Sequence, residues 1–181
     1  MILEYREMEM DEAEKIAEID AAWYIKNAWR MNMKSGRYEL VEINWKSTEL
    51  PNGYEWHLQH LKDTLKTGGK AFGCFEDDVL VGYATLEREI FGQRQKYVLL
   101  EQLFVSKTYR AKGIGKRLFS LCAKQAIQFG AEKIYLCAAS AENTIAFYRK
   151  IGCKAAMEVN QKLFKEDPKD IPLEYILCEV G

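Results

Sequence analysis

A junction between a predicted strand and a predicted helix constrains the fold of this chain more than any other feature. The apolar run from Tyr97 to Val105 predicts a buried strand. Ile114 to Phe129 carries apolar side chains at positions 114, 118, 121, 122, 126 and 129, the spacing of one helical face, and Gly130 is a stop signal. The connecting segment, Arg110-Ala111-Lys112-Gly113-Ile114-Gly115, therefore leads from a strand end into a helix start.

This connecting loop has the properties of an anion site. Gly113 and Gly115 remove side chains where the backbone turns, so an anion can approach the amide N–H groups. The start of a helix adds unpaired N–H donors and a partial positive charge. Four nearby cations are Arg110, Lys112, Lys116 and Arg117. A ligand with several phosphate charges, such as a diphosphate, would suit the loop; the alternative is a solvated basic helix start.

Two common phosphate loops do not fit this segment. A Walker A loop needs glycine at position 110, which is Arg110, and Ser or Thr after Gly115-Lys116, where Arg117 stands. A dinucleotide-binding fingerprint needs a third glycine at position 118, which is Leu118. Neither a P-loop nor a Rossmann motif is therefore expected.

The rest of the chain predicts an alternation of strands and helices, and hence a mixed α/β fold. Helices are expected over Asp11 to Ala22, Tyr54 to Leu65 and Asn143 to Ile151, and residues 23–50 are not assigned. Strands are expected over Ile2 to Arg6, Ala71 to Phe75, Val79 to Glu89, Ile134 to Ala138, Lys154 to Val159 and Leu173 to Glu179.

Bulk composition limits the classes of function. With 181 residues and 48% hydrophobic residues, we expect a single domain spanning residues 1–181. Lys and Arg total 26 against 27 Asp and Glu, so no global field favours nucleic acid or an anionic membrane. Neither a signal peptide nor a membrane-spanning stretch is evident. The five cysteines include no CxxC pair, which favours a reduced, cytoplasmic location.

Two segments resemble the GNAT superfamily of N-acetyltransferases. LEQLFVSKTYRAKGIGKRLF is similar to that family's strand followed by Arg/Gln-x-x-Gly-x-Gly/Ala and a helix. NTIAFYRKIGCK is similar to its second signature, in which an Asn opens a helix that carries a Tyr before a Gly-containing turn. The resemblance covers residues 70–160 well, and the first 70 residues only in a strand-helix-helix outline. It implies a mostly antiparallel sheet of six to seven strands, flanked by helices.

The resemblance also implies how a donor would bind. Acetyl-CoA would be the cosubstrate, with no metal. The backbone of Leu103, Phe104 and Val105 would pair with the pantetheine arm, and one N–H would face the thioester oxygen. Such a ligand needs a V-shaped splay between the strand ending at Val105 and the one starting at Ile134. The residues that would bind the pyrophosphate are Arg110, Ala111, Lys112, Gly113, Ile114, Gly115 and Lys116.

Three side chains take roles from the same resemblance. Tyr148 resembles the family's acid, because a phenol is protonated at neutral pH and can donate to a departing thiolate. Its alternative role is structural packing. Asn143 could bind the cofactor, cap its helix, or do both. Glu101 resembles the position from which some members withdraw the ammonium proton, and burial would raise its pKa.

Strand alternation predicts the location of Glu101. That alternation places it on the face of Leu99, Leu103 and Val105, where an apolar residue is expected. The alternative is that Glu101 pairs with a cation or points to solvent at the strand edge.

The acceptor side is less constrained. All four tryptophans, Trp23, Trp29, Trp45 and Trp56, fall within residues 23–56, where they could line an acceptor groove or form the core of a covering segment. His57 and His60 lack a third ligand for a metal, and Cys137 suits a buried hydrophobe, so direct transfer is expected. The expected acceptor is a primary amine of a small molecule or peptide; a homodimer is compatible with the sequence. The alternative is a non-catalytic acyl-CoA sensor or interaction module.

Overall fold

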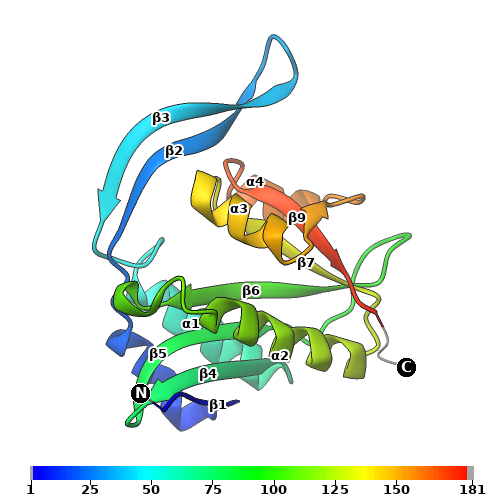
Figure 1. Ribbon diagram of the computed structural model, residues 1–181. Helices are drawn as coiled ribbons and strands as arrows, with labels where there is room; N and C mark the ends of the chain where they lie inside the picture. Colours follow the sequence, from blue (N-terminus) through cyan, green and yellow to red (C-terminus); the bar gives the residue numbers. More distant parts are fainter. Residues whose placement is uncertain (1, 179–181) are drawn as a thin grey trace.

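A computed structural model describes residues 2–178 and has a mixed α/β fold (Figure 1). Its strands are β1 (Glu4–Glu7), β2 (Trp23–Asn32), β3 (Arg37–Ser47), β4 (Lys70–Glu76), β5 (Val79–Leu86), β6 (Tyr97–Val105), β7 (Lys133–Ala138), β8 (Lys154–Ala155) and β9 (Ile171–Ile176). Its helices are α1 (Tyr54–Lys66), α2 (Ile114–Gln128), α3 (Glu142–Lys150) and α4 (Gln161–Glu166), with 3₁₀ helices η1 (Met10–Glu18) and η2 (Lys107–Tyr109).

Seven of these strands form one sheet in the order β1-β4-β5-β6-β7-β9-β8. The β6–β7 pair is parallel and every other neighbouring pair is antiparallel. This sheet confirms the predicted mostly antiparallel architecture. β2 and β3 form a separate antiparallel hairpin that extends away from the sheet (Figure 1).

Helices cover both faces of the seven-stranded sheet. On one face, α2 and α3 contribute Leu118, Cys122 and Ile145 to a buried cluster that includes Val98 and Leu100 of β6. On the other face, η1 and α1 pack over a second cluster of buried side chains. Its members include Ile16, Leu61, Leu80 and Tyr83. Side chains of β6 therefore meet α2 and α3 on one face of the sheet, and η1 and α1 on the other.

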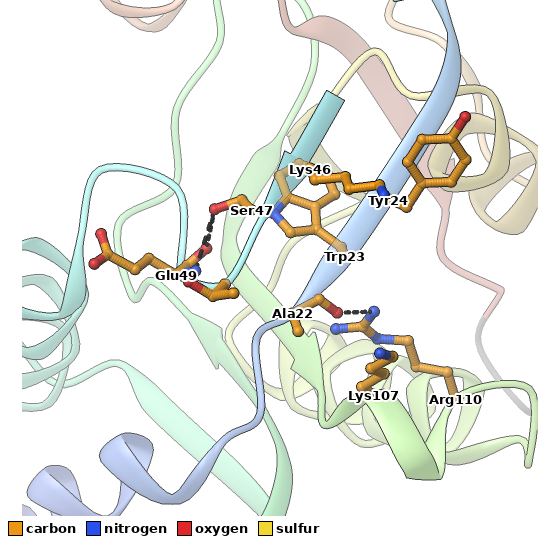
Figure 2. Close-up of a pocket in the computed structure, with 9 residues that line it drawn as sticks. Ala22, Trp23, Tyr24, Lys46, Ser47, Glu49, Lys107 and Arg110 are labelled. Carbon is orange, nitrogen blue, oxygen red and sulfur yellow. Dashed lines mark hydrogen bonds between the residues drawn. The ribbon is translucent and has the colours of Figure 1, made fainter. Parts of the chain in front are cut away.

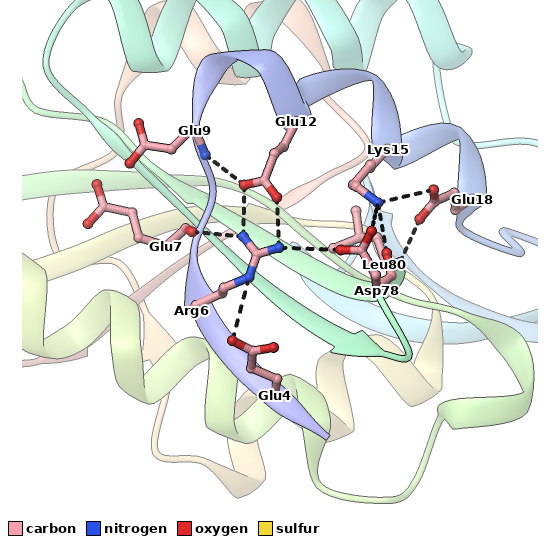
Figure 3. Close-up of polar contacts among 9 residues, drawn as sticks. All are labelled: Glu4, Arg6, Glu7, Glu9, Glu12, Lys15, Glu18, Asp78 and Leu80. Carbon is pink, nitrogen blue, oxygen red and sulfur yellow. Dashed lines mark hydrogen bonds and ion pairs between the residues drawn. The ribbon is translucent and has the colours of Figure 1, made fainter. Parts of the chain in front are cut away.

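The 3₁₀ helix η1 is attached to the sheet by a network of charges (Figure 3). The Arg6 guanidinium donates to both carboxylate oxygens of Glu12, at 2.8 and 2.7 Å, and lies over the ring of Phe75. Lys15 pairs with Asp78 at 3.2 Å in the β4–β5 turn. A bidentate pair is more geometrically specific than a single surface ion pair, so this network fixes η1 against β4 and β5.

The N-terminal prediction needs two corrections. The first helix is η1, a 3₁₀ helix that ends at Glu18, because the Asp20 amide donates to Ser106 Oγ at 3.0 Å and draws the chain toward the end of β6. The strand-helix-helix outline is wrong, because the hairpin of β2 and β3 lies between the two helices.

The C-terminal prediction also differs from the structure. The strand expected over Lys154 to Val159 is limited to Lys154–Ala155, because the Glu158 carboxylate turns to accept the amides of Gln93 and Arg94. Asn160 then caps α4, which was not predicted, by accepting the Leu163 amide at 3.2 Å. The last strand ends at Ile176, and Glu179, the predicted end, lies outside the described residues.

Candidate active site

The central strands β6 and β7 pair only at their first residues. Tyr97, Val98 and Leu99 pair with Lys133, Ile134 and Tyr135, and no pairing follows. Beyond Leu99, β6 pairs only with β5 on its other side, as far as Val105. The strands diverge visibly from this point (Figure 1), which confirms the predicted splay. Leu103, Phe104 and Val105 all lie in the part of β6 that β7 does not pair with.

A β-bulge lies where this divergence begins. Thr85 pairs with Gln102, but the next residue, Leu86, pairs with Leu100, so Glu101 is an extra residue with no partner on β5. A bulge bends its strand, increases the local twist and redirects side chains. Here it interrupts strict alternation along β6 at Glu101, the residue whose face alternation predicts.

The bulge overturns the predicted face of Glu101. Leu103 and Val105 pack against the cluster that α2 and α3 cover. The charges that act most strongly on Glu101 come instead from Glu87, Glu166 and Asp63, and Asp63 belongs to α1 on the opposite face. Glu101 therefore does not share the face of Leu103 and Val105.

The environment of Glu101 is unusual for a carboxylate. Burial raises the pKa of Glu101 to about 7, with the adjacent Glu87 carboxylate as the second cause. Neither a cation partner nor full solvent exposure is found for it: the residue is half-buried, and no ion pair involving it occurs within residues 2–178. A group that gains and loses a proton near pH 7 can act as a general base at that pH.

The loop after β6 has a backbone shaped for an anion. Ala111 and Gly113 have positive φ values of 61° and 84°, which turns successive amides toward one side. Within the described residues, the N–H groups from Ala111 to Lys116 have no hydrogen-bond acceptor. The first bond of α2 is made by Arg117, whose amide donates to Gly113 O at 3.1 Å. A row of unpaired donors at a helix start is a binding site for phosphate.

The two glycines of the loop have different roles. A Cβ on Gly113 would meet nothing within 4 Å, so this position needs glycine for its left-handed backbone. A Cβ on Gly115 would lie 3.2 Å from the ring of Phe147, so Gly115 allows the start of α2 to approach α3. We had expected both glycines to make room for the anion, and for Gly115 the structure gives a packing reason.

Of the four cations near the loop, two contact other protein groups and two form no ion pair within the described part of the chain. Arg110 turns inward, donating to Val105 O at 2.9 Å and to Ala22 O at 2.8 Å, as Figure 2 shows for the Ala22 bond. The Arg117 guanidinium lies over the ring of Tyr5. Lys112 and Lys116 are exposed and form no ion pair within the described part of the chain. Arg110 thus holds the loop to the end of β6 and to the residue just before β2.

Tyr148 lies on α3, in the cluster shared with α2. It is 8% exposed, and burial raises the pKa of its phenol above the usual range. No hydrogen bond from its Oη is found among residues 2–178, so the phenol is free to donate. Asn143 is exposed and is not the cap of α3, because Ala141 is; the Asn143 Oδ1 accepts the neighbouring Thr144 amide at 3.0 Å. Its capping interpretation is therefore wrong in position.

The four tryptophans do not form one wall. Trp23 and Trp45 pack edge to face at the base of the hairpin, with ring centroids 5.1 Å apart. Trp29 lies beneath Arg149 of α3, and Trp56 stacks on His60 within α1. Trp23 also packs against a small buried cluster of Ile25 and Ala28 of the hairpin with Ala141 at the start of α3, so Trp23 belongs to the core of a covering segment.

The hairpin strand β2 connects the diverging ends of β6 and β7. Ala22, just before β2, accepts the bond from Arg110, which lies beyond the end of β6. Farther along, the Trp29 amide donates to Ser140 O at 2.8 Å, just beyond β7. A pocket of about 650 Å³ lies at the hairpin base, where Trp23, Tyr24, Lys107 and Arg110 are among the lining residues (Figure 2). Sequence patterns did not reveal this pocket, because residues 23–50 were left unassigned.

The remaining candidates serve local structure. His57 Nε2 lies 2.6 Å from Pro51 O and His60 Nδ1 lies 2.7 Å from Trp56 O. Within residues 2–178, no group of three or more His, Cys, Asp or Glu side chains is arranged to hold a metal.

Burial raises the pKa of the Cys137 thiol to about 12, which keeps it protonated and unreactive near pH 7. Over residues 2–178, no helix is long and apolar enough to cross a membrane.

A sheet that splits beside a row of unpaired amides defines a class of α/β protein that holds a phosphate-bearing ligand along an open strand. Comparison with known families makes this assignment specific. The chain belongs to the acetyltransferase (GNAT) family, whose model matches residues 37–153. It is accordingly an acetyl-CoA-dependent N-acetyltransferase.

Solved structures share this fold. A nourseothricin acetyltransferase superposes with a TM-score of 0.75 at 17% identity, covering 98% of this chain and 100% of its own. A protein from Bacillus anthracis str. Ames in complex with acetyl coenzyme A gives 0.69 at 18%, covering 98% of both chains. The PaiA N-acetyltransferase from Thermoplasma acidophilum, in complex with coenzyme A, gives 0.61 at 18%, covering 97% and 99%. No curated protein matches the chain.

Proposed function

We propose that this protein transfers the acetyl group of acetyl-CoA directly to a primary amine of a small molecule, such as a polyamine, an aminoglycoside or an amino acid, or of a peptide. One observation carries the donor half of this proposal. The unpaired N–H groups from Ala111 to Lys116 begin where β6 has separated from β7. A pyrophosphate on this row would leave the pantetheine arm beside Leu103, Phe104 and Val105.

Glu101 is the proposed base. An amine that is protonated near pH 7 must lose a proton before its nitrogen can attack the thioester carbonyl. The N–H bond of the ammonium breaks and an O–H bond forms on the Glu101 carboxylate, whose pKa of about 7 suits that transfer. The surrounding carboxylates of Glu87, Asp63 and Glu166 favour a cationic acceptor over a neutral or anionic one.

Tyr148 is the proposed acid. As the C–S bond of the thioester breaks, its phenol gives a proton to the departing thiolate. Its raised pKa keeps the phenol protonated across the pH range in which Glu101 titrates. Lys112 and Lys116 would add charge to the pyrophosphate site, and Asn143 lies exposed at the start of α3, where a cofactor contact is open to it.

The acceptor can be found with purified protein, acetyl-CoA and a panel of polyamines, aminoglycosides, streptothricin-type antibiotics, amino acids and peptides. Release of free thiol reports turnover, and mass spectrometry locates the acetyl group. We expect turnover with one or more cationic primary amines. Binding of acetyl-CoA without turnover on any amine would instead support a non-catalytic sensor, and turnover only with anionic amino acids would contradict the electrostatic argument.

A further inference from the structure

The residue beside the bulge has a role that sequence motifs do not indicate. Glu87 directly follows β5, and its amide donates to Leu99 O of β6 at 2.8 Å. This bond extends the pairing of β5 and β6 past the bulge and places Glu87 opposite Leu99, so Glu87 and Glu101 are diagonal neighbours on adjacent strands. The carboxylate of Glu87 accepts a hydrogen bond from Thr64 Oγ1 of α1. Thr64 is 1% exposed, so the donor is fixed by packing.

We propose that Glu87 is a positioning residue for acetyl transfer, which holds Glu101 at the splay as the acceptor of the ammonium proton. Thr64 holds Glu87, and Glu87 in turn places a negative charge against Glu101. This inference rests on the proposed role of Glu101 as base. It adds a residue that does not itself touch the reacting atoms.

The electrostatics around Glu101 agree with this geometry. Carboxylates face it from three elements: Glu87 after β5, Glu166 of α4 and Asp63 of α1. The buried phenol of Tyr83 also lies near it. Among the three carboxylates Glu87 acts most strongly, through its charge and through a direct side-chain contact. A like charge in contact disfavours the ionised form and therefore increases the proton affinity of Glu101.

The test measures the titration of Glu101 directly. Isotope-edited infrared spectroscopy follows its carboxyl band, which is assigned by its loss in Glu101→Gln. In Glu87→Gln the midpoint should fall by about one pH unit, because a neutral amide replaces the like charge. Asp63→Asn, the weakest of the three neighbours, is the matched control and should lower the midpoint by a small fraction of that shift. A midpoint that is unchanged in Glu87→Gln, or that moves equally in Asp63→Asn, would overturn the proposal.

Thr64→Val supplies a second variant. It removes the donor that holds the Glu87 carboxylate, with little change in volume, so the contact between Glu87 and Glu101 is loosened. The Glu101 midpoint should therefore fall, by less than in Glu87→Gln. A merely structural role of Thr64 or Glu87 would lower thermal stability without moving the midpoint.

The pH dependence of kcat/KM separates this inference from the proposed function. If Glu101 is the base, the acidic limb of the wild-type profile disappears in Glu101→Gln and moves to lower pH in Glu87→Gln. An acidic limb that persists in Glu101→Gln would remove Glu101 as base, and the catalytic role of Glu87 with it, even if the infrared midpoint moves. Loss of the limb in Glu101→Gln with no shift in Glu87→Gln would leave the base in place and overturn the role of Glu87.

Discussion

The loop after β6 and the bulge within β6 present different chemical groups to a charged ligand. The loop presents backbone amides from Ala111 to Lys116, and two of the four nearby cations, Arg110 and Arg117, contact other parts of the chain. The bulge presents the side chain of Glu101, surrounded by other carboxylates. A backbone site depends on φ and ψ and tolerates varied side chains, whereas a side-chain site is altered by a single substitution. The donor site should therefore be robust and the acceptor site specific.

The largest expected effect is on the acceptor side. Glu101→Gln keeps the shape of the side chain and removes the proposed base, so kcat/KM for the amine should fall by about 10²–10³-fold. The KM for acetyl-CoA should remain nearly unchanged, because the loop is intact. Steady-state kinetics with each substrate varied in turn makes the measurement. Glu132→Gln, an exposed residue paired with Lys96, is the control and should behave as wild type.

An equal loss in the two variants, or a rise in the KM for acetyl-CoA in Glu101→Gln alone, would contradict the division between the two sites. The pH profile adds a second criterion. Because the base must be ionised, kcat/KM should rise with pH and level off above about 7, the pKa of Glu101.

The next effect tests the proposed acid, Tyr148. Tyr148→Phe removes only the phenolic oxygen, so kcat should fall by about 10- to 100-fold with a smaller change in the KM for acetyl-CoA. Tyr175→Phe is a suitable control, because Tyr148 and Tyr175 both pack near Phe119. Stopped-flow measurement of thiol release reports the step. Equal changes in kcat and in acetyl-CoA affinity would identify Tyr148 as a binding residue.

A smaller effect distinguishes the backbone of the loop from its side chains. Gly113→Ala forces a left-handed conformation on alanine, which costs about 1 kcal/mol, and should raise the KM for acetyl-CoA by about 5- to 10-fold. Gly130→Ala imposes a similar backbone cost at the other end of α2, with φ of 86° and no atom within 4 Å. Both variants should lose similar stability in urea, but only Gly113→Ala should weaken the donor.

Lys112→Ala sharpens this result, because Lys112 is exposed and stacks on Tyr109. It should raise the KM less than Gly113→Ala does. A larger effect of Lys112→Ala, measured by isothermal titration with coenzyme A, would show that side chains dominate the donor site after all.

The sequence predicted the two sites unequally for physical reasons. The loop was predictable because glycines, cations and the change from strand to helix are all local signals, and β6 was placed from Tyr97 to Val105 as found. The bulge was not predictable, because the position of an unpaired residue in β6 depends on its pairing register with β5, which no local sequence pattern encodes. Glu87 was missed for the same reason. The hairpin was missed because an exposed ribbon lacks a clear alternation, and β3 is exposed along most of its length.

The smallest predicted effect concerns the stability cost of the acceptor side. The Glu101 pKa rises from about 4.3 in the unfolded chain to about 7 in the folded one, so the folded state binds more protons between these values. The free energy of unfolding should therefore fall as pH rises through this window and level off above 7. Partial exposure limits the change to about 1 kcal/mol. Urea unfolding at pH 5 and pH 8 measures it, and Glu101→Gln should show less of this dependence.

Asp170, whose pKa is also raised to about 7 by burial and by Asp167, contributes in the same direction, so Asp170→Asn is compared in parallel. If the free energies of unfolding of Glu101→Gln and wild type differ by the same amount at both pH values, the Glu101 carboxylate is not destabilised in the folded state. The loop carries no comparable buried charge, because its anion would arrive with the ligand. Burial of the Glu101 carboxylate should therefore lower the free energy of unfolding at high pH. The backbone amides of the loop carry no net charge and should add no such pH dependence.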